Sequence, residues 1–153
     1  MNKFIIRITS TFFFVGFFPF IPGTFGSLAG LMLFYLISFN KLLVIFSTVF
    51  LIIIGFAVGT AAEKIFMVKD SRFIVIDEVA GMFISLLFIP LDPRLVIMAF
   101  FFFRMFDTIK PYPAYKIQSL PGSIGIMGDD IVAGIYTNVL IQLFLKVNFL
   151  IGS

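Results

Sequence analysis

One stretch of the chain, Leu42 to Ala62, contains no charged residue and is long enough to cross a bilayer as a helix. A helix rises about 1.5 Å per residue, so about 20 apolar residues cross the hydrocarbon layer of a membrane. A second segment, Ile131 to Gly152, has one charged residue, Lys146, close enough to its end for the ammonium group to reach the interface. These two segments predict a membrane protein.

The composition agrees with lipid as the surrounding solvent. Of the 153 residues, 61% are apolar and 12% are charged, whereas soluble domains carry about 25% charged residues. This balance excludes an ordinary soluble domain, a disordered chain and a nucleic-acid-binding protein, although the pI is about 9.3. The chain has no cysteine and no histidine, so thiolate and imidazole chemistry are excluded as well.

Two further apolar regions are too short or too interrupted to be simple spans. Gly26 to Phe39 reaches spanning length only if the preceding turn also lies at membrane depth. Val79 to Phe103 is long enough, but Pro90-Leu-Asp-Pro-Arg94 lies at its middle, where prolines and charges are unfavourable. We expect residues 79–106 to form a short helical hairpin with this pentapeptide at its tip. One kinked span is the alternative.

The N-terminal segment, Asn2 to Phe18, combines two basic residues with an apolar run. It is predicted as a retained interfacial or re-entrant helix, because no Ala-x-Ala-like cleavage site follows it. With the hairpin in place, eight of the 11 Lys and Arg residues lie on one face of the membrane, which predicts that this face is cytoplasmic. They are Lys3, Arg7, Lys64, Lys69, Arg72, Arg104, Lys110 and Lys116. The expected fold is therefore all-α: one polytopic membrane domain, residues 1–153, with four to five membrane segments.

Five of the eight acidic residues lie in three short clusters: Asp77-Glu78, Asp107 and Asp129-Asp130. Each cluster is close to the end of an apolar segment. Helix-end charges are one interpretation, because Asp and Glu stabilise helix N-termini, but Asp107 is expected at a C-terminus, where an anion is disfavoured. The other interpretation is a site for Mg²⁺, which takes carboxylates, water and phosphate oxygens as ligands.

Basic and hydroxyl residues accompany the acids. Arg104, Asp107 and Lys110 recur every three residues and share a helix face. This face is either a set of salt bridges, or a site where Asp107 holds metal while the two cations bind phosphate oxygens. Thr24 and Ser27 lie in a Pro- and Gly-rich turn that is either a helix cap or an anion-binding nest.

A Gly-rich segment, Gly122 to Gly128, leads into Asp129-Asp130. Its glycines predict either a flexible loop or a close approach of the backbone to another group. Gly81 and Gly134 each follow an acid by one helical turn, and small residues at such positions allow helices to pack closely in lipid.

Four of these segments, in this order and spacing, resemble the bacterial phosphatidylglycerophosphatase A family: Pro22-Gly-Thr-Phe-Gly-Ser27, Ile74-Val-Ile-Asp-Glu-Val-Ala-Gly81, Phe103-Arg-Met-Phe-Asp-Thr-Ile-Lys-Pro-Tyr-Pro113 and Gly125-Ile-Met-Gly-Asp-Asp-Ile-Val-Ala-Gly134. The resemblance implies a multi-pass, Mg²⁺-dependent lipid phosphatase of the bacterial inner membrane, with its active-site loops on the cytoplasmic face. Such an enzyme converts phosphatidylglycerophosphate to phosphatidylglycerol and phosphate.

The residues then take expected roles. The five clustered carboxylates, Asp77, Glu78, Asp107, Asp129 and Asp130, are expected to hold Mg²⁺ and position water, with one of them open to act as a base or nucleophile. Arg104 and Lys110 are expected to bind the phosphate, with Thr24 and Ser27 as further donors, and Asp70 and Arg72 as outer candidates. The expected partner is a phospholipid, with no nucleic acid and no protein partner evident. The alternative function is a small transporter or channel whose interfacial carboxylates bind a cation.

Overall fold

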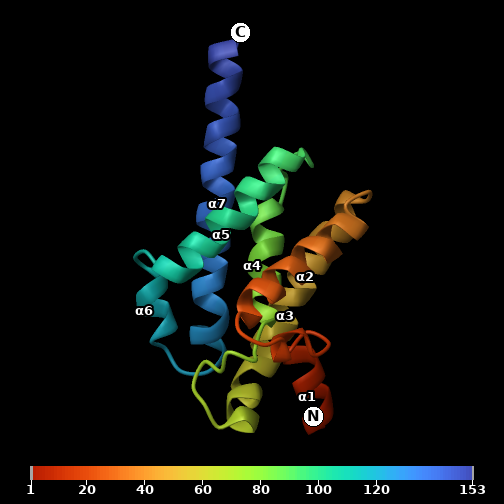
Figure 1. Ribbon diagram of the computed structural model, residues 1–153, viewed down its shortest axis with the longest axis vertical. Coiled ribbons are helices and arrows are strands. Elements are labelled where there is room, and N and C mark those ends of the chain that lie inside the picture. Colours follow the sequence, from red (N-terminus) through yellow and green to blue (C-terminus); the bar gives the residue numbers. More distant parts are fainter. Residues whose placement is uncertain (1, 153) are drawn as a thin grey trace.

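The computed structural model describes residues 2–152, which are helical and contain no strand. Seven α-helices and one short 3₁₀-helix follow one another along this part of the chain (Figure 1). They are α1 (Lys3–Ser10), η1 (Val15–Phe17), α2 (Pro22–Ile37), α3 (Lys41–Phe66), α4 (Ile76–Leu86), α5 (Pro93–Ile109), α6 (Ala114–Gln118) and α7 (Ser123–Gly152).

The two longest helices are those expected to cross the membrane. α3 has 26 residues, and the apolar part of α7, Ser123–Leu150, has 28, so both exceed the length that a span requires. Each is uncharged or nearly so over a window of 18 residues, and about two thirds of that window is not covered by the rest of the molecule. α2 is also apolar but has 16 residues.

The predicted helix break at the Pro90–Arg94 pentapeptide is present. α4 ends at Leu86 and α5 begins at Pro93, where the Asp92 carboxylate accepts a hydrogen bond from the Arg94 N–H at 2.8 Å. Figure 1 shows the chain rising through α4, turning, and returning through α5 towards the base of the molecule. A helix-turn-helix unit of 11 and 17 residues is therefore formed in place of one kinked helix.

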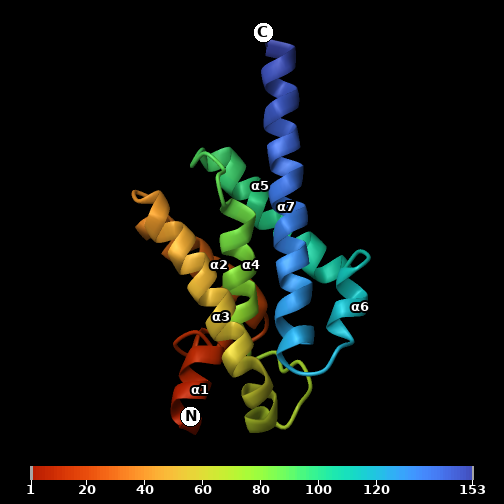
Figure 2. The ribbon, with the colours of Figure 1, turned by 180° about the vertical axis from the view of Figure 1, so that it is seen from behind.

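α4 is the central helix of the bundle. Ten of its 11 residues are buried, and it packs against α2, α3, α5 and α7. α4 and α7 run in the same direction (Figure 2). They approach closely at the predicted glycine pair, because a Cβ built on Gly134 would lie 2.6 Å from the Gly81 carbonyl oxygen.

The other end of α4 is also held by α7. Asn138 Nδ2 donates to the carbonyl oxygens of Ile84 at 3.1 Å, Ser85 at 3.2 Å and Leu87 at 2.7 Å. These carbonyls belong to the last turn of α4, where a helix runs out of N–H donors, although the Ile84 carbonyl also accepts from the Leu87 N–H at 3.2 Å. The amide of Asn138 therefore adds donors for polar groups at a buried helix end.

The N-terminal prediction was wrong in its boundary. The helix ends at Ser10 and does not continue to Phe18, because Phe12, Phe13 and Phe14 adopt positive φ values of 45°, 54° and 69°. Thr11 stabilises this reversal, since its hydroxyl donates to the Arg7 carbonyl at 2.8 Å and accepts from the Phe14 N–H at 3.1 Å.

The last span also begins earlier than predicted. α7 starts at Ser123, so all of the glycine-rich segment except Gly122 is helical and is not a flexible loop. Its first residue is bound to α3: the Ser123 hydroxyl accepts from the Thr60 N–H at 2.8 Å, and the Ser123 N–H donates to Thr60 Oγ1 at 2.9 Å. Asp129 and Asp130 therefore lie in the second turn of α7 and not at its opening.

Candidate active site

The predicted carboxylates come from three helices that meet near the base of the bundle. Asp77 and Glu78 occupy the first turn of α4, Asp107 the last turn of α5, and Asp129-Asp130 the second turn of α7. One carboxylate oxygen each of Asp77, Glu78 and Asp130 lie within 4.8 Å of one another. Asp77 and Asp130 are buried, with 7% and 3% of their surfaces exposed.

Several oxygens of this cluster are buried and have no hydrogen-bond partner. They are Asp77 Oδ1, Glu78 Oε2, Asp129 Oδ1 and Asp130 Oδ2. Burial disfavours the charged forms of Asp77 and Glu78, and the proximity of the two carboxylates to each other and to Asp130 disfavours those forms further. An unpaired buried carboxylate is unfavourable unless a cation or a proton compensates it.

This arrangement fits a hard divalent cation. Mg²⁺ takes oxygen ligands, and the three clustered carboxylates offer unpaired oxygens from two helices without thiolate or imidazole competitors. The residues present are therefore suited to Mg²⁺, and Asp77, Glu78 and Asp130 are the ones that would hold it.

Two cations border the carboxylates. Arg104 Nη1 lies 2.6 Å from Asp107 Oδ2, and Lys110 Nζ lies 3.1 Å from Asp107 Oδ1 and 2.5 Å from Asp129 Oδ2. Burial lowers the pKa of Lys110, but the carboxylates of Asp107, Asp129 and Asp130 outweigh it and keep that pKa above its ordinary value. Salt bridges therefore do join this helix face, and they extend across to α7.

The start of α2 closes the site on the side of Glu78 and Arg104. A Cβ built on Gly23 would overlap Glu78 Oε1 and lie 3.3 Å from both terminal nitrogens of Arg104. Ser27, one turn later, accepts a hydrogen bond from Arg104 Nη1 at 3.3 Å and donates to the Gly23 carbonyl at 2.9 Å. The sequence predicted hydrogen-bond donors in this segment. It did not predict that Gly23 leaves space for the Glu78 carboxylate, because that contact joins two helices that are distant in the sequence.

The remaining candidates lie further out. Thr24 is partly buried in the first turn of α2, where its N–H donates to the Ile21 carbonyl at 3.1 Å. Asp70 is exposed and accepts a hydrogen bond from Gln118 Nε2 at 2.8 Å, and it is not part of the cluster formed by Asp77, Glu78 and Asp130. The structure does not bring Arg72 to the carboxylates, because its guanidinium lies over the Phe73 ring, 5.3 Å from the centroid.

A family model for phosphatidylglycerophosphatase A matches residues 8–145, which include α2 to α6, every site residue and most of α7. The chain belongs to the phosphatidylglycerophosphatase A family. The phosphatidylglycerophosphatase A of Escherichia coli K12 is 39% identical over 120 residues, covering 76% of this chain and 70% of that protein. Phosphatidylglycerophosphatase A of Haemophilus influenzae is 37% identical over 126 residues, covering 78% and 76%.

Another relative carries a different name. A Bacteroides thetaiotaomicron protein is 37% identical over 149 residues, covering 91% of this chain and 92% of that protein, and has the provisional name phosphatidylinositol-3-phosphatase. No solved structure matches the chain. Membership of the phosphatidylglycerophosphatase A family thus agrees with the resemblance of the four motifs, whose helices form the site.

Proposed function

We propose that this protein hydrolyses the terminal phosphomonoester of phosphatidylglycerophosphate, giving phosphatidylglycerol and phosphate in phospholipid synthesis. The observation that carries the proposal is the group of buried, unpaired carboxylate oxygens beside two cations. Carboxylates suit a divalent metal, and the cations suit the phosphate that the metal would share. The family membership supports the same substrate.

In this proposal Asp77, Glu78 and Asp130 hold Mg²⁺, while Asp107 and Asp129 orient the cations and complete the ligand set. When bound, Mg²⁺ supplies polarisation of the phosphoryl group and activation of water. Such a role accounts for buried carboxylates that have no protein partner. It also requires neither cysteine nor histidine, and the chain contains neither.

Arg104 and Lys110 bind the phosphate oxygens. Both cations are held by Asp107 at the edge of the cluster, and both are partly exposed, with 23% and 20% of their side-chain surfaces accessible. Each can therefore donate further hydrogen bonds to a phosphate that arrives from the membrane face. The Ser27 hydroxyl, which accepts from Arg104, and the space left by Gly23 keep the Arg104 side chain on the side of Glu78. Thr24 and Ser27 are the further donors to the phosphate in this proposal.

In hydrolysis, the oxygen of a water bonds to phosphorus, the ester P–O bond breaks, and a proton reaches the departing glycerol oxygen. One of the carboxylates takes the proton from the attacking water, or one of them attacks phosphorus directly and is released by water afterwards. The two routes use the same residues and differ in whether a phosphoryl group is transiently bonded to the protein.

We also propose the placement in the membrane. α3 and α7 cross the bacterial inner membrane, α2 and the α4–α5 hairpin enter it, and α1 lies at the interface. The excess of Lys and Arg on the loops around the site supports a cytoplasmic location for the carboxylates. Acyl chains of the substrate then lie along the apolar helices with the headgroup at the cytoplasmic rim.

The test is phosphate release by the purified protein from a panel of lipids, with and without Mg²⁺. We expect rapid, Mg²⁺-dependent release from phosphatidylglycerophosphate and slower release from phosphatidic acid. Phosphatidylinositol 3-phosphate belongs in the panel because of the provisional name of the Bacteroides relative. A preference for that lipid would overturn the substrate assignment. Absence of release together with cation flux into liposomes would favour the transport alternative.

A further inference from the structure

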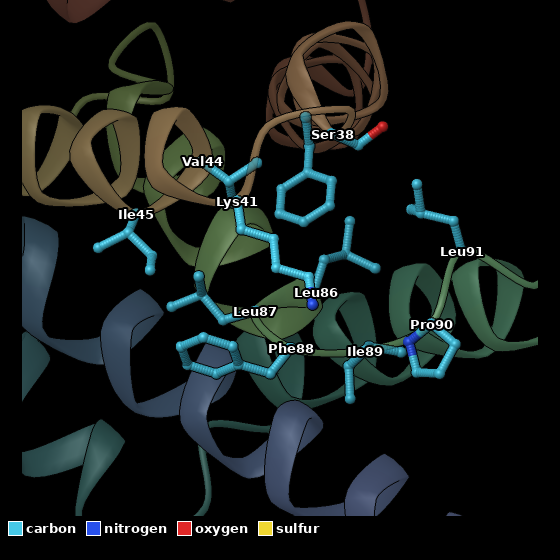
Figure 3. A pocket seen from close by; sticks show the side chains of 11 residues that line it. Ser38, Lys41, Val44, Ile45, Leu86, Leu87, Phe88, Ile89, Pro90 and Leu91 are labelled. Atoms are coloured by element: carbon cyan, nitrogen blue, oxygen red, sulfur yellow. The ribbon is translucent and has the colours of Figure 1, made fainter.

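A cavity lies far from the carboxylates. It has a volume of about 410 Å³ and is lined by Phe34, Ser38, Lys41, Val44, Ile45 and residues 86–91 (Figure 3). It sits between the α2–α3 turn and the α4–α5 turn, at the end of α4 opposite Asp77. Asp77 and Leu86 are nine positions apart on α4, which is a rise of about 14 Å, so the cavity and the carboxylates are separate.

The lining is apolar apart from Ser38 and Lys41. The Ser38 hydroxyl already donates to the Tyr35 carbonyl at 2.7 Å. Figure 3 shows the Lys41 side chain extending from the start of α3 into the cavity. Among the residues that the structure describes, no acid forms an ion pair with Lys41 and no acceptor binds its ammonium group.

The cavity is also open at its edge. Phe88 is 75% exposed and Leu91 41% exposed, and both lie in the turn that forms one wall. Exposed apolar side chains beside an apolar cavity suit a hydrocarbon chain, and an unpaired ammonium group suits an anion. A phospholipid with net negative charge combines a hydrocarbon chain and an anionic group in one molecule.

We propose that this cavity binds an anionic phospholipid, with an acyl chain among Phe34, Val44 and the 86–91 turn and the phosphate on Lys41. In the proposed membrane placement this lipid belongs to the outer leaflet. The inference rests on that placement but not on the proposed reaction. It assigns Lys41 to a lipid site that is independent of the carboxylates.

The test is native mass spectrometry of the purified protein titrated with phosphatidylserine or phosphatidylcholine. Phosphatidylserine is neither a phosphomonoester nor the proposed product, so it reports on this cavity. We expect the wild type to bind phosphatidylserine at least about threefold more tightly than phosphatidylcholine. Lys41→Gln should remove that preference, Lys41→Arg should keep it, and Lys146→Gln, with the same loss of charge on α7, should leave it unchanged.

A second variant tests the apolar part of the site. Ile45→Trp should fill the cavity and weaken phosphatidylserine binding while Lys41 is intact. Equal binding of the two lipids by the wild type would overturn the proposal, as would undiminished phosphatidylserine binding by Lys41→Gln. If Ile45→Trp leaves phosphatidylserine binding unchanged and raises the KM for a lipid substrate, the cavity holds the substrate's chain and the proposal is wrong. These readouts are binding constants, so failure of the proposed phosphatase reaction leaves them interpretable.

Discussion

Gly23 provides the sharpest test of the site. It has no side chain, so its substitution by Ala removes no reactive group and changes only the space beside the site. Its Cα faces Glu78 and Arg104 so closely that a methyl group there would overlap Glu78 Oε1 and lie 3.3 Å from both Arg104 terminal nitrogens. Gly23→Ala therefore adds one carbon atom at the point where α2 meets the carboxylate cluster. The Glu78 carboxylate must move away, and it can do so because it is the free end of a flexible side chain.

The expected effects on stability and on activity differ in size. Gly23 lies in the first turn of α2, where Ala is compatible with the backbone and favours a helix by up to about 1 kcal/mol. That gain offsets the strain of displacing Glu78, so the free energy of unfolding should change by no more than about 1 kcal/mol. Displacing a catalytic group by about 1 Å lowers rates by about 100-fold, which corresponds to about 2.7 kcal/mol in the barrier.

The measurement is kcat/KM for phosphate release by Gly23→Ala, together with the melting temperature in the same detergent. The matched control is Gly55→Ala in α3, where the new methyl group would meet only the flexible end of Met127. We expect the control to keep nearly full activity. If Gly23→Ala has wild-type kcat/KM at an unchanged melting temperature, Glu78 is not held against α2 during turnover and its assignment to the site fails.

Four further predictions address the carboxylates and the membrane placement. Asp107→Asn removes the partner of both cations and should lower kcat/KM by at least about 100-fold, whereas Asp92→Asn at the hairpin tip should not; equal activity of the two variants would remove Asp107 from the site. Chelation by EDTA should stop turnover and Mg²⁺ should restore it. Mg²⁺ at about 100 times its dissociation constant should raise the free energy of unfolding of the wild type by about 2.7 kcal/mol and should leave that of Asp130→Asn unchanged. An equal increase in the two proteins would exclude Asp130 as a ligand. Single cysteines at Lys69 and Lys116, in a chain with none of its own, should be labelled from the cytoplasmic side only, and labelling from opposite sides would refute the hairpin placement.

Much of the helical framework follows from local sequence. α3 and the apolar part of α7 were predicted because uncharged runs of this length have few alternatives. The break before α5 was predicted because two prolines and two charges are unfavourable in the middle of a span. In the structure Pro93 opens α5 and Asp92 caps its first turn. The first-turn position of Asp77 and Glu78 follows in the same way from the start of an apolar segment.

Other boundaries depend on contacts between distant residues. The start of α7 is stabilised by hydrogen bonds between Ser123 and Thr60, which are 63 positions apart, so a glycine-rich segment that suggests a loop becomes helical. The end of α1 depends on Thr11, whose hydroxyl serves both the helix and the turn after it. The same limitation applies to the site: the clustering of acids and cations was expected, but the position of Glu78 against Gly23 requires two helices to meet.

The register of α4 against α7 explains how carboxylates that repel one another stay together. Asp77 precedes Gly81 by four residues, and Asp130 precedes Gly134 by four, so in two helices that run in the same direction each acid lies one turn before a glycine. The close approach of the two glycines therefore brings the acids into proximity one turn earlier. Repulsion between the carboxylates acts to separate the helices at that end, while the three hydrogen bonds from Asn138 hold them together at the other. The helix crossing thus holds together a concentration of negative charge that local folding would avoid, and a cation bound there would relieve the repulsion.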